Sequence, residues 1–472
     1  MSLEEIFAEG NSPEKIIGFL SGQQKGCPSW SSLEKDFVPE NHAIVADGTR
    51  RPKIKIKNGK KEVPAKLVYP AEMIAARRMT QMAFSIPVKR VYSQPENESE
   101  KEFQKAIEKV YDSVRIDGVN SKRMYAYFAG CEFATFWFVV EGNEEHDRYG
   151  FQTKNKIRCR TFTPMPEKYT KLQEAAIYHY YDDMGDMIAL SFEYKDSEDV
   201  VHFDTYTAEN TYYFTKGKGS SWEVETVANP LGKISGVYLW RPLPVYYGIS
   251  DNRDEIEFTM SRTSDNIRKN TYPIMKVKGE IEGELPVGDT ARQVYKLSEG
   301  GDVGLIAPAL TTSDSKTHVE MLKQINSEIT QLPDLSLENI RGINAISGEA
   351  RKTLLADPHL RVMEESHDII EAFDREFNVV KAIIAHEKPE WKKYVNTTTC
   401  KHVVTPFIQN DTTSDIANLT KANGGKPLLS QKTSVSQAGL VEDPEAEYEL
   451  IVAEEQQQAE RERMVDLFTG AE

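Results

Sequence analysis

The stretch LPDLSLENIRGINAISGEARKTLL, residues Leu332 to Leu355, separates two helical patterns. Proline lacks an amide hydrogen and clashes with the preceding helical turn, so the first helix should end at or before Leu332, ahead of Pro333. Ser347 can cap the free amides of a second helix, and Glu349 favours the positive end of its dipole. About a dozen residues without helical or strand alternation lie between them, and long unstructured loops are uncommon in compact domains. The loop therefore invites a functional explanation, against the alternative of an ordinary helix-to-helix connection.

The composition is that of a globular, acidic chain. Its 472 residues are 39% hydrophobic and 10% aromatic, which is enough for a sizeable core. There are 74 acidic residues against 58 basic ones, giving a formal net charge of −16. This balance argues against a protein that grips nucleic acid by blanket phosphate neutralisation, although it is compatible with a loose contact with DNA. The N-terminus lacks the pattern of a signal peptide and no apolar run is long enough to span a bilayer, so we expect cytoplasmic folding and no membrane partner.

The sequence carries no recognisable catalytic or metal-binding motif. The four cysteines lie far apart without a C-x-x-C pair, and we expect them to be reduced and buried. A phosphate loop, an H-E-x-x-H motif, a G-x-S-x-G elbow and a dinucleotide fingerprint are all missing from the sequence. We therefore predict a protein that is not an enzyme and that uses neither cofactor nor metal. An unrecognised enzyme in the aromatic region from Tyr125 to Gly236 is the least favoured alternative, because those aromatic residues suit a packed sheet.

Hydrophobic periodicity predicts an α+β fold. Apolar residues at helical spacing predict helices in residues 69–84 and 99–115. From about Tyr125 to Gly236, aromatic and β-branched residues dominate and predict a mostly antiparallel region.

The second half of the sequence is predicted to be chiefly helical. Helices are expected at Ser250–Tyr272 and Ser313–Leu332, with a small strand-containing insert between them. A long helical tract from about Gly348 to His386 follows, with a kink expected at Pro358. The segment Glu442–Glu472 has eleven acidic residues against two arginines and predicts a polar terminal helix.

Several local patterns occur in one order along the second half of the chain. They are NPLGKISGVYLW (Asn229–Trp240), the helix start Gly248-Ile249-Ser250-Asp251, YPIMKVKG (Tyr272–Gly279), GGDVGLIAP (Gly300–Pro308), LPDLSLENIRGINAISGEA (Leu332–Ala350) and LSQKTSVSQAGLVEDPEAEYELIVAEE (Leu429–Glu455). Together they resemble the portal proteins of tailed double-stranded DNA bacteriophages, of the SPP1 type. The matched blocks cover roughly half of the chain, and Ser235-Gly236 stands where relatives commonly have a proline.

The resemblance implies a portal-like ring subunit with a wing, a two-helix stem, a clip and a crown. The expected boundaries are wing 1–249, stem helix 250–273, clip 274–313, second stem helix 314–333, tunnel loop 334–347, wing 348–440 and acidic crown 441–472. On this interpretation the opening loop projects into an axial channel.

The resemblance also implies a function. In the family, a ring of about twelve subunits occupies one capsid vertex and conducts double-stranded DNA during packaging and ejection. The implied partners are copies of the same chain, the DNA, the terminase motor, a head-tail adaptor, and the major capsid and scaffolding proteins. The implied location is the virion, after assembly in the host cytoplasm. Another virion adaptor or minor capsid interaction protein is the alternative.

An acidic chain suits a DNA conduit, because carboxylates repel phosphates evenly and leave few adhesive sites. A few polar or basic side chains at the constriction can still steer the duplex. The candidate residues are Asn339, Arg341 and Asn344 in the tunnel loop, and Arg262, Arg268 and Lys269 on the first stem helix. A solvated helix face or an intersubunit salt bridge is an equally acceptable interpretation of the stem cations. Candidate partner contacts in the clip are Glu280, Glu282 and Glu284, with simple solubility as the alternative.

Overall fold

The computed structural model divides into two compact units, which are described separately: residues 1–339 with 355–407, and residues 340–354 with 408–472. The structure describes residues 3–8, 11–23, 25–52, 55–57, 60–217, 219, 221–270, 274–278, 281–282, 296–297, 300–306, 312–332, 355–407, 430–433 and 446–457. In the second unit, residues 446–457 are helical, as predicted for that part of the acidic terminal segment.

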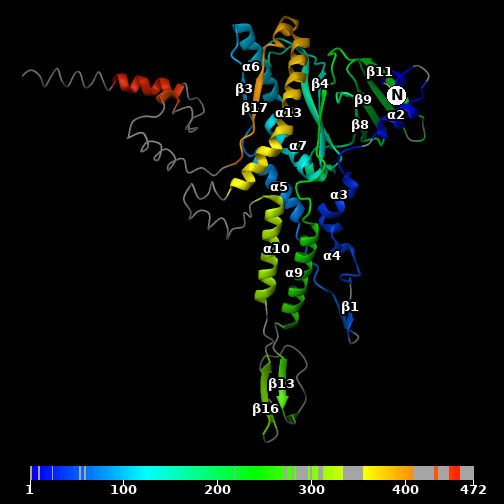
Figure 1. Cartoon of the computed structure of the whole chain (residues 1–472), viewed down its shortest axis with the longest axis vertical. Coiled ribbons are helices and arrows are strands. Elements are labelled where there is room, and N and C mark those ends of the chain that lie inside the picture. The colour runs from blue at the N-terminus through cyan, green and yellow to red at the C-terminus, as the bar shows by residue number, and fades with distance from the viewer. Residues whose placement is uncertain are drawn as a thin grey trace, which may run out of the picture. The chain divides into compact units, whose positions relative to one another are not determined.

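The first unit begins with short helices, a hairpin and three longer helices (Figure 1). The elements are α1 (Leu3–Ile6), α2 (Pro13–Ser21), α3 (Trp30–Phe37), the 3₁₀ helix η1 (Pro39–Asn41), α4 (Ala43–Ala46), β1 (Lys55–Lys57), β2 (Lys60–Glu62), α5 (Ala71–Phe84), β3 (Lys89–Tyr92), α6 (Glu98–Ser113) and α7 (Ile116–Gly130). Asn97 caps α6, because its side chain accepts a hydrogen bond of 3.0 Å from the amide of Glu100. The two helices predicted in this region are confirmed as α5 and α6.

Two sheets form the central part of the unit. Their strands are β4 (Glu132–Val140), β5 (Lys156–Thr163), β6 (Gln173–Glu174), β7 (Ala176–Tyr181), β8 (Met187–Lys195), β9 (Val201–Tyr206), β10 (Asn210–Lys216), β11 (Glu223–Ala228) and β12 (Gly236–Trp240), with the short helix α8 (Glu167–Thr170) after β5. One sheet has the order β12-β4-β5-β6 and the other β11-β10-β9-β8-β7. All pairs are antiparallel except β5 with β6, so the predicted mostly antiparallel region is confirmed.

Apolar side chains join these elements in layers. On one face of the five-stranded sheet, Phe192 and Tyr206 pack with Ala134 and Phe162 of the four-stranded sheet. On its other face, Phe203 and other apolar residues of the sheet pack against α1 and α2. The largest cluster lies among α5, α6, α7, the four-stranded sheet and the long helix α13 (Ala356–Glu387). Burial of this apolar surface is the main term that holds the unit together.

The order helix, strand-containing insert, helix is also confirmed. Helix α9 (Ser250–Asn270) is followed by β13 (Ile274–Lys278), β14 (Ile281–Glu282), β15 (Lys296–Leu297), β16 (Asp302–Ile306) and α10 (Thr312–Thr330), and after α13 come η2 (Pro389–Tyr394) and β17 (Cys400–Val403). Strand β13 pairs antiparallel with β16, β14 with β15, and β17 with the distant β3. Helix α9 therefore ends before Pro273, and α10 ends before Pro333, as predicted.

Two local predictions were wrong. The residues from Tyr125 to Gly130 belong to α7 and not to a strand. Nearly all of this part of α7 is buried, so it lacks the one-sided apolar pattern that identifies a surface helix. Pro358 does not kink the interior of a helix, because α13 begins at Ala356 and Pro358 lies in its first turn. A first-turn amide has no partner within the helix, so proline costs little there.

The cysteines are all free, as expected. Cys27 and Cys131 are buried, whereas Cys159 and Cys400 are only partly buried. The prediction of burial thus holds for two of them.

A buried ion pair joins α7, β4 and α13. Arg123 donates to both carboxylate oxygens of Glu376, at 2.8 and 2.7 Å, and the side chains of both residues are almost fully buried. The same guanidinium donates to Asn120 and Thr135, while Trp137 Nε1 donates to Glu376 at 2.8 Å. Each charge is therefore both paired and hydrogen-bonded, which is the condition for keeping it in the core.

We expect Glu376→Ala to lower the free energy of unfolding by about 3–5 kcal/mol, because it leaves the Arg123 charge buried without a counterion. Denaturant unfolding followed by tryptophan fluorescence measures this change. Glu371→Ala is the control on the same helix: Glu371 is exposed in its ion pair with Arg375, and its loss should cost less than about 1 kcal/mol. Equal losses in the two variants would contradict a structural role for the buried pair.

Candidate functional site

The two helices α9 and α10 lie side by side, and we use the word stem as a label for this pair (Figure 1). Asn252 Nδ2 donates to Asn326 Oδ1 at 3.0 Å, and His318 Nε2 lies 3.8 Å from Glu255 Oε1. Leu322 is buried on α10. These contacts occupy one side of α9.

A row of polar side chains follows the other side of α9. Arg253, Glu257, Ser261 and Asp265 are spaced four residues apart, so they share one face of the helix. The first three are at most 2% exposed, and the Asp265 side chain is 20% exposed. Buried polar groups need partners, and these residues find theirs on the N-terminal part of the chain. We call this row and its partners the stem seam.

An extended segment ahead of α5 supplies alternate amides to the seam. The amide of Tyr69 donates to Glu257 Oε1 at 2.8 Å and that of Leu67 donates to Ser261 Oγ at 2.9 Å. The amide of Ala65 donates to Asp265 Oδ1 at 2.9 Å. Four helical residues rise about 6 Å and two extended residues about 6.7 Å, so every second amide meets every fourth helical side chain. The segment is thereby fixed antiparallel to α9.

Charged groups surround the end of the seam nearest the start of α9. Arg253 Nη1 donates to the Asp36 carbonyl at 2.8 Å and lies 3.1 Å from Glu72 Oε1. The guanidinium also contacts the carboxylates of Asp36 and Asp254, at 3.2 and 3.0 Å. One arginine, only 2% exposed, therefore connects α3, α5 and α9, and the loss of a partner would leave its charge buried without full compensation.

A buried histidine completes this cluster. His42 Nε2 lies 2.9 Å from the carbonyl oxygen of Asp36, which can only accept, so this nitrogen carries a proton. Its Nδ1 lies 2.7 Å from Glu257 Oε1, and both side chains are completely buried. A contact of this length between a ring nitrogen and a carboxylate oxygen requires one proton between them.

Glu72 is the most perturbed carboxyl of the cluster. Burial raises its pKa from an ordinary value of 4.5 to about 7, although the nearby Arg253 acts in the opposite direction. Among the groups that favour the ionised form, the charge of Arg253, 3.1 Å from Oε1, acts most strongly. The folded protein therefore holds a proton on Glu72 at a pH at which the unfolded chain releases it.

Specific backbone contacts terminate α10 at its C-terminal end. Gln331 has a φ of 52°, in the left-handed region, and the amide of Leu332 donates to the carbonyl of Ser327 at 3.2 Å. This is the six-to-one hydrogen bond that ends many helices. Arg361 of α13 donates to the carbonyl of Thr330 at 2.7 Å, and Leu332 is buried in the main core. The point at which the chain leaves α10 is therefore fixed.

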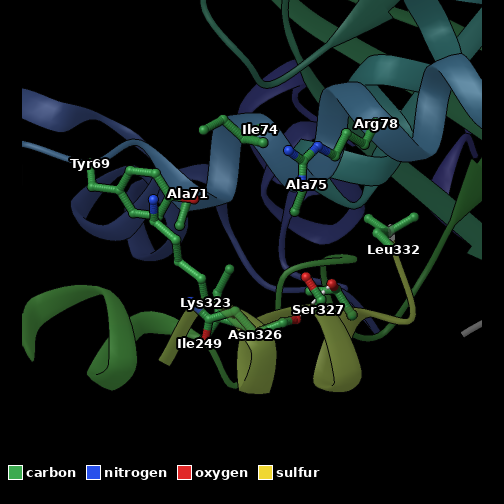
Figure 2. A pocket seen from close by; sticks show the side chains of 11 residues that line it. Tyr69, Ala71, Ile74, Ala75, Arg78, Ile249, Lys323, Asn326, Ser327 and Leu332 are labelled. Carbon is green, nitrogen blue, oxygen red and sulfur yellow. Dashed lines mark hydrogen bonds between the residues drawn. The ribbon is translucent and has the colours of Figure 1, made fainter. Parts of the chain in front are cut away.

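A small cleft lies beside this end of α10, between α5 and α10 (Figure 2). Lys323 reaches across it toward Tyr69, whose ring centroid is 5.2 Å from the Nζ atom. The lining residues are Tyr69, Ala71, Ile74, Ala75, Arg78, Ile249, Lys323, Asn326, Ser327, Thr330 and Leu332. The cleft marks where the stem meets the core of the unit. Its lining has no paired nucleophile and base.

Some of the predicted site residues lie in the described part of the chain and others do not. Arg262 and Arg268 lie on α9 with exposed side chains, and the guanidinium of Arg262 lies over the Phe258 ring at 5.4 Å. Lys269 lies in the last turn of α9, and Glu282 lies in β14. The other predicted site residues, Asn339, Arg341, Asn344, Glu280 and Glu284, lie outside the described residues.

The stem seam was not predicted from the sequence. Polar residues at four-residue spacing are its only local signal, and such a row usually indicates a solvated helix face. Its partners lie about 200 positions away in the chain. Periodicity carries no information about such a pairing.

Within the residues that the structure describes, no group of three or more His, Cys, Asp or Glu side chains has a metal-binding arrangement. Among the described helices, none is long and apolar enough to cross a membrane. The hydrogen bonds of the seam fix α9 against the segment ahead of α5.

We expect Ser261→Ala to lower the free energy of unfolding by about 1–3 kcal/mol, because it leaves the amide of Leu67 without an acceptor. Urea unfolding followed by circular dichroism measures the change. Thr259→Ala is the matched control, because its hydroxyl makes only an exposed contact of 3.3 Å with Glu255 and should matter by less than about 0.5 kcal/mol. A loss no larger than that of the control would show that the Ser261 bond contributes nothing.

The raised pKa of Glu72 predicts a pH dependence. Between about pH 4.5 and pH 7 the unfolded chain releases a proton that the folded protein keeps, so the free energy of unfolding should fall as pH rises, by roughly 3 kcal/mol in all. Glu72→Gln cannot titrate and should remove this part of the slope. Urea unfolding at a series of pH values tests this, and an unchanged slope in Glu72→Gln would contradict the assignment.

Comparison with known families identifies the chain. A family model described as phage portal protein, SPP1 Gp6-like, matches residues 34–461. A comparison with curated proteins gave no match. The family match includes the residues of the stem seam on both sides, as well as the patterns from Asn229 to Glu455 that suggested the resemblance. The chain belongs to the SPP1 Gp6-like family of phage portal proteins.

Proposed function

We propose that the chain forms a closed ring at one vertex of a phage capsid and provides the channel through which double-stranded DNA is packaged and ejected. The observation that carries the proposal is the family match over residues 34–461. The order α9, strand pair, α10 and the fixed exit of α10 support it, because they fit a stem, a clip and a loop in sequence. The ring would belong to the virion and assemble in the host cytoplasm.

The parts of the chain take the following roles in this proposal. Residues 1–249 and 348–440 are the wing, 250–273 and 314–333 the stem, 274–313 the clip, 334–347 the tunnel loop and 441–472 the crown. The clip would dock the terminase motor and later the head-tail adaptor, with Glu280, Glu282 and Glu284 as contacts. The wing and crown would meet the major capsid and scaffolding proteins. No cofactor is required, because energy for packaging would come from the separate motor.

The negative charge of the chain supports a channel through which DNA moves, and not a site that binds DNA tightly. The chain carries a formal charge of −16, and a ring multiplies this charge around the channel. Like charges keep phosphates from binding firmly, so the duplex meets few deep minima as it moves. Arg341, Asn339 and Asn344 in the tunnel loop would supply the close contacts that steer it, with Arg262, Arg268 and Lys269 on the stem as secondary contacts.

We expect the purified protein to form a closed ring with a central hole and about twelve subunits, the number that the family resemblance implies. A head-to-tail interface produces such a ring when its rotation closes. Native mass spectrometry gives the number of subunits, and negatively stained end-on particles show the hole. A protein that remains monomeric over a wide range of concentration and salt would contradict the proposal. That result would favour another virion adaptor or minor capsid protein.

A further inference from the structure

The densest positive charge of the chain lies between α4 and α5. Residues 50–66 contain eight basic residues against one acidic residue, in a chain of formal charge −16. Because the remainder of the chain repels phosphate, a firm contact with a duplex has to be confined to a local basic element. This segment is the strongest such element in the sequence.

Three of the eight cations already have structural partners. Arg50 Nη1 lies 3.1 Å from Asp254 Oδ2, and Lys66 Nζ donates to the carbonyl of Val45 at 3.0 Å. Arg51 forms an ion pair with Asp265. The other five are lysines within residues 53–61, and four of them, Lys55, Lys57, Lys60 and Lys61, lie in strands β1 and β2.

One residue before the β1–β2 hairpin and one after it bind the same carboxylate. Asp265 accepts from the guanidinium of Arg51 through Oδ2 and from the amide of Ala65 through Oδ1. The chain is therefore fixed to α9 both before β1 and after β2. A hairpin whose flanking residues are fixed loses less freedom on binding than a free segment does, which favours a docking role.

The register of the hairpin places like charges opposite each other. Lys57 pairs with Lys60 across the two strands, and Ile56 pairs with Lys61. In the same register, Lys55 pairs with the acidic residue Glu62. Like charges directly opposite destabilise an antiparallel pair, and a two-stranded hairpin is only marginally stable in water. A bound polyanion would remove this repulsion.

We propose that the β1–β2 hairpin binds the phosphate backbone of double-stranded DNA without sequence preference. Lysines supply compact charges that neutralise phosphates, and contacts to the backbone carry no sequence information. The inference rests on the proposed function in one respect, that duplex DNA reaches the ring. An acidic face of a neighbouring copy is the competing partner, and the experiment separates the two.

The experiment measures binding of the full chain to a labelled duplex of random sequence by fluorescence anisotropy, between about 50 and 200 mM salt. The test variant carries Lys55→Gln, Lys57→Gln, Lys60→Gln and Lys61→Gln. The matched control carries Lys105→Gln, Lys122→Gln, Lys154→Gln and Lys156→Gln, four exposed lysines elsewhere in the same unit. Both variants change the net charge equally, so long-range repulsion of DNA is matched.

We expect the control to bind like the unchanged protein and the hairpin variant to bind at least about tenfold more weakly at the lowest salt, because glutamine cannot neutralise a phosphate. The slope of log affinity against log salt should shrink by about 0.9 for each phosphate that the variant no longer neutralises. A second variant that carries only Lys57→Gln and Lys60→Gln should show a smaller loss of affinity. It removes the like charges that lie opposite each other, so it should not destabilise the fold.

The ring is checked in parallel by native mass spectrometry. If the hairpin variant binds DNA as the control does, or if the unchanged protein does not bind the duplex, the proposal is overturned. If the hairpin variant alone fails to form the ring, the hairpin serves a subunit contact and the proposal is also overturned. A third outcome separates the two proposals. If the unchanged protein forms no ring but binds DNA, and the hairpin variant loses that binding, DNA binding by the hairpin is supported and the portal function is contradicted.

Discussion

The stem seam is the constraint on which the position of α9 depends. Its side chains are buried along a helix that would otherwise be held mainly by α10, and each polar atom that loses water must find a partner. The partners are backbone amides of the segment ahead of α5, which also makes these amides unavailable to any sheet. The rise of four helical residues and the rise of two extended residues differ by about 0.7 Å. The hydrogen bonds between side chains of α9 and amides of the segment can therefore stay in register for only a few consecutive pairs.

Two consequences follow for the rest of the unit. At one end of the seam, Arg253 connects α9 to α3 and α5, so the start of the stem is tied to the core. At the other end, Asp265 binds Arg51 before the β1–β2 hairpin and the amide of Ala65 after it. On α10, the left-handed Gln331 and the bond from Arg361 fix where the chain leaves the helix. Specific polar contacts thus position both helices, along one face of α9 and at the C-terminal end of α10.

Local signals predicted much of the fold and little of the site. The end of α10 was predicted correctly from Pro333, because proline disrupts a helix through contacts with the residues near it in the chain. The residues from Tyr125 to Gly130 were assigned to a strand, since a helix buried on nearly all sides shows no amphipathic period. The family was identified from ordered motifs in the second half of the chain, and the match over residues 34–461 extends it to the first. The seam could not be predicted, because it pairs a helix with a segment about 200 positions away and neither shows the pairing in its own sequence.

The most direct test of the seam is hydrogen exchange of single amides in residues 65–69, measured on the assembled protein by mass spectrometry with fragmentation. In the described part of the chain, the amides of Ala65, Leu67 and Tyr69 donate to the seam, whereas those of Lys66 and Val68 donate no hydrogen bond. The account predicts an alternation in which the first three exchange slowly and the other two exchange fast. Uniform exchange across the five positions would show that α9 is not held in this way.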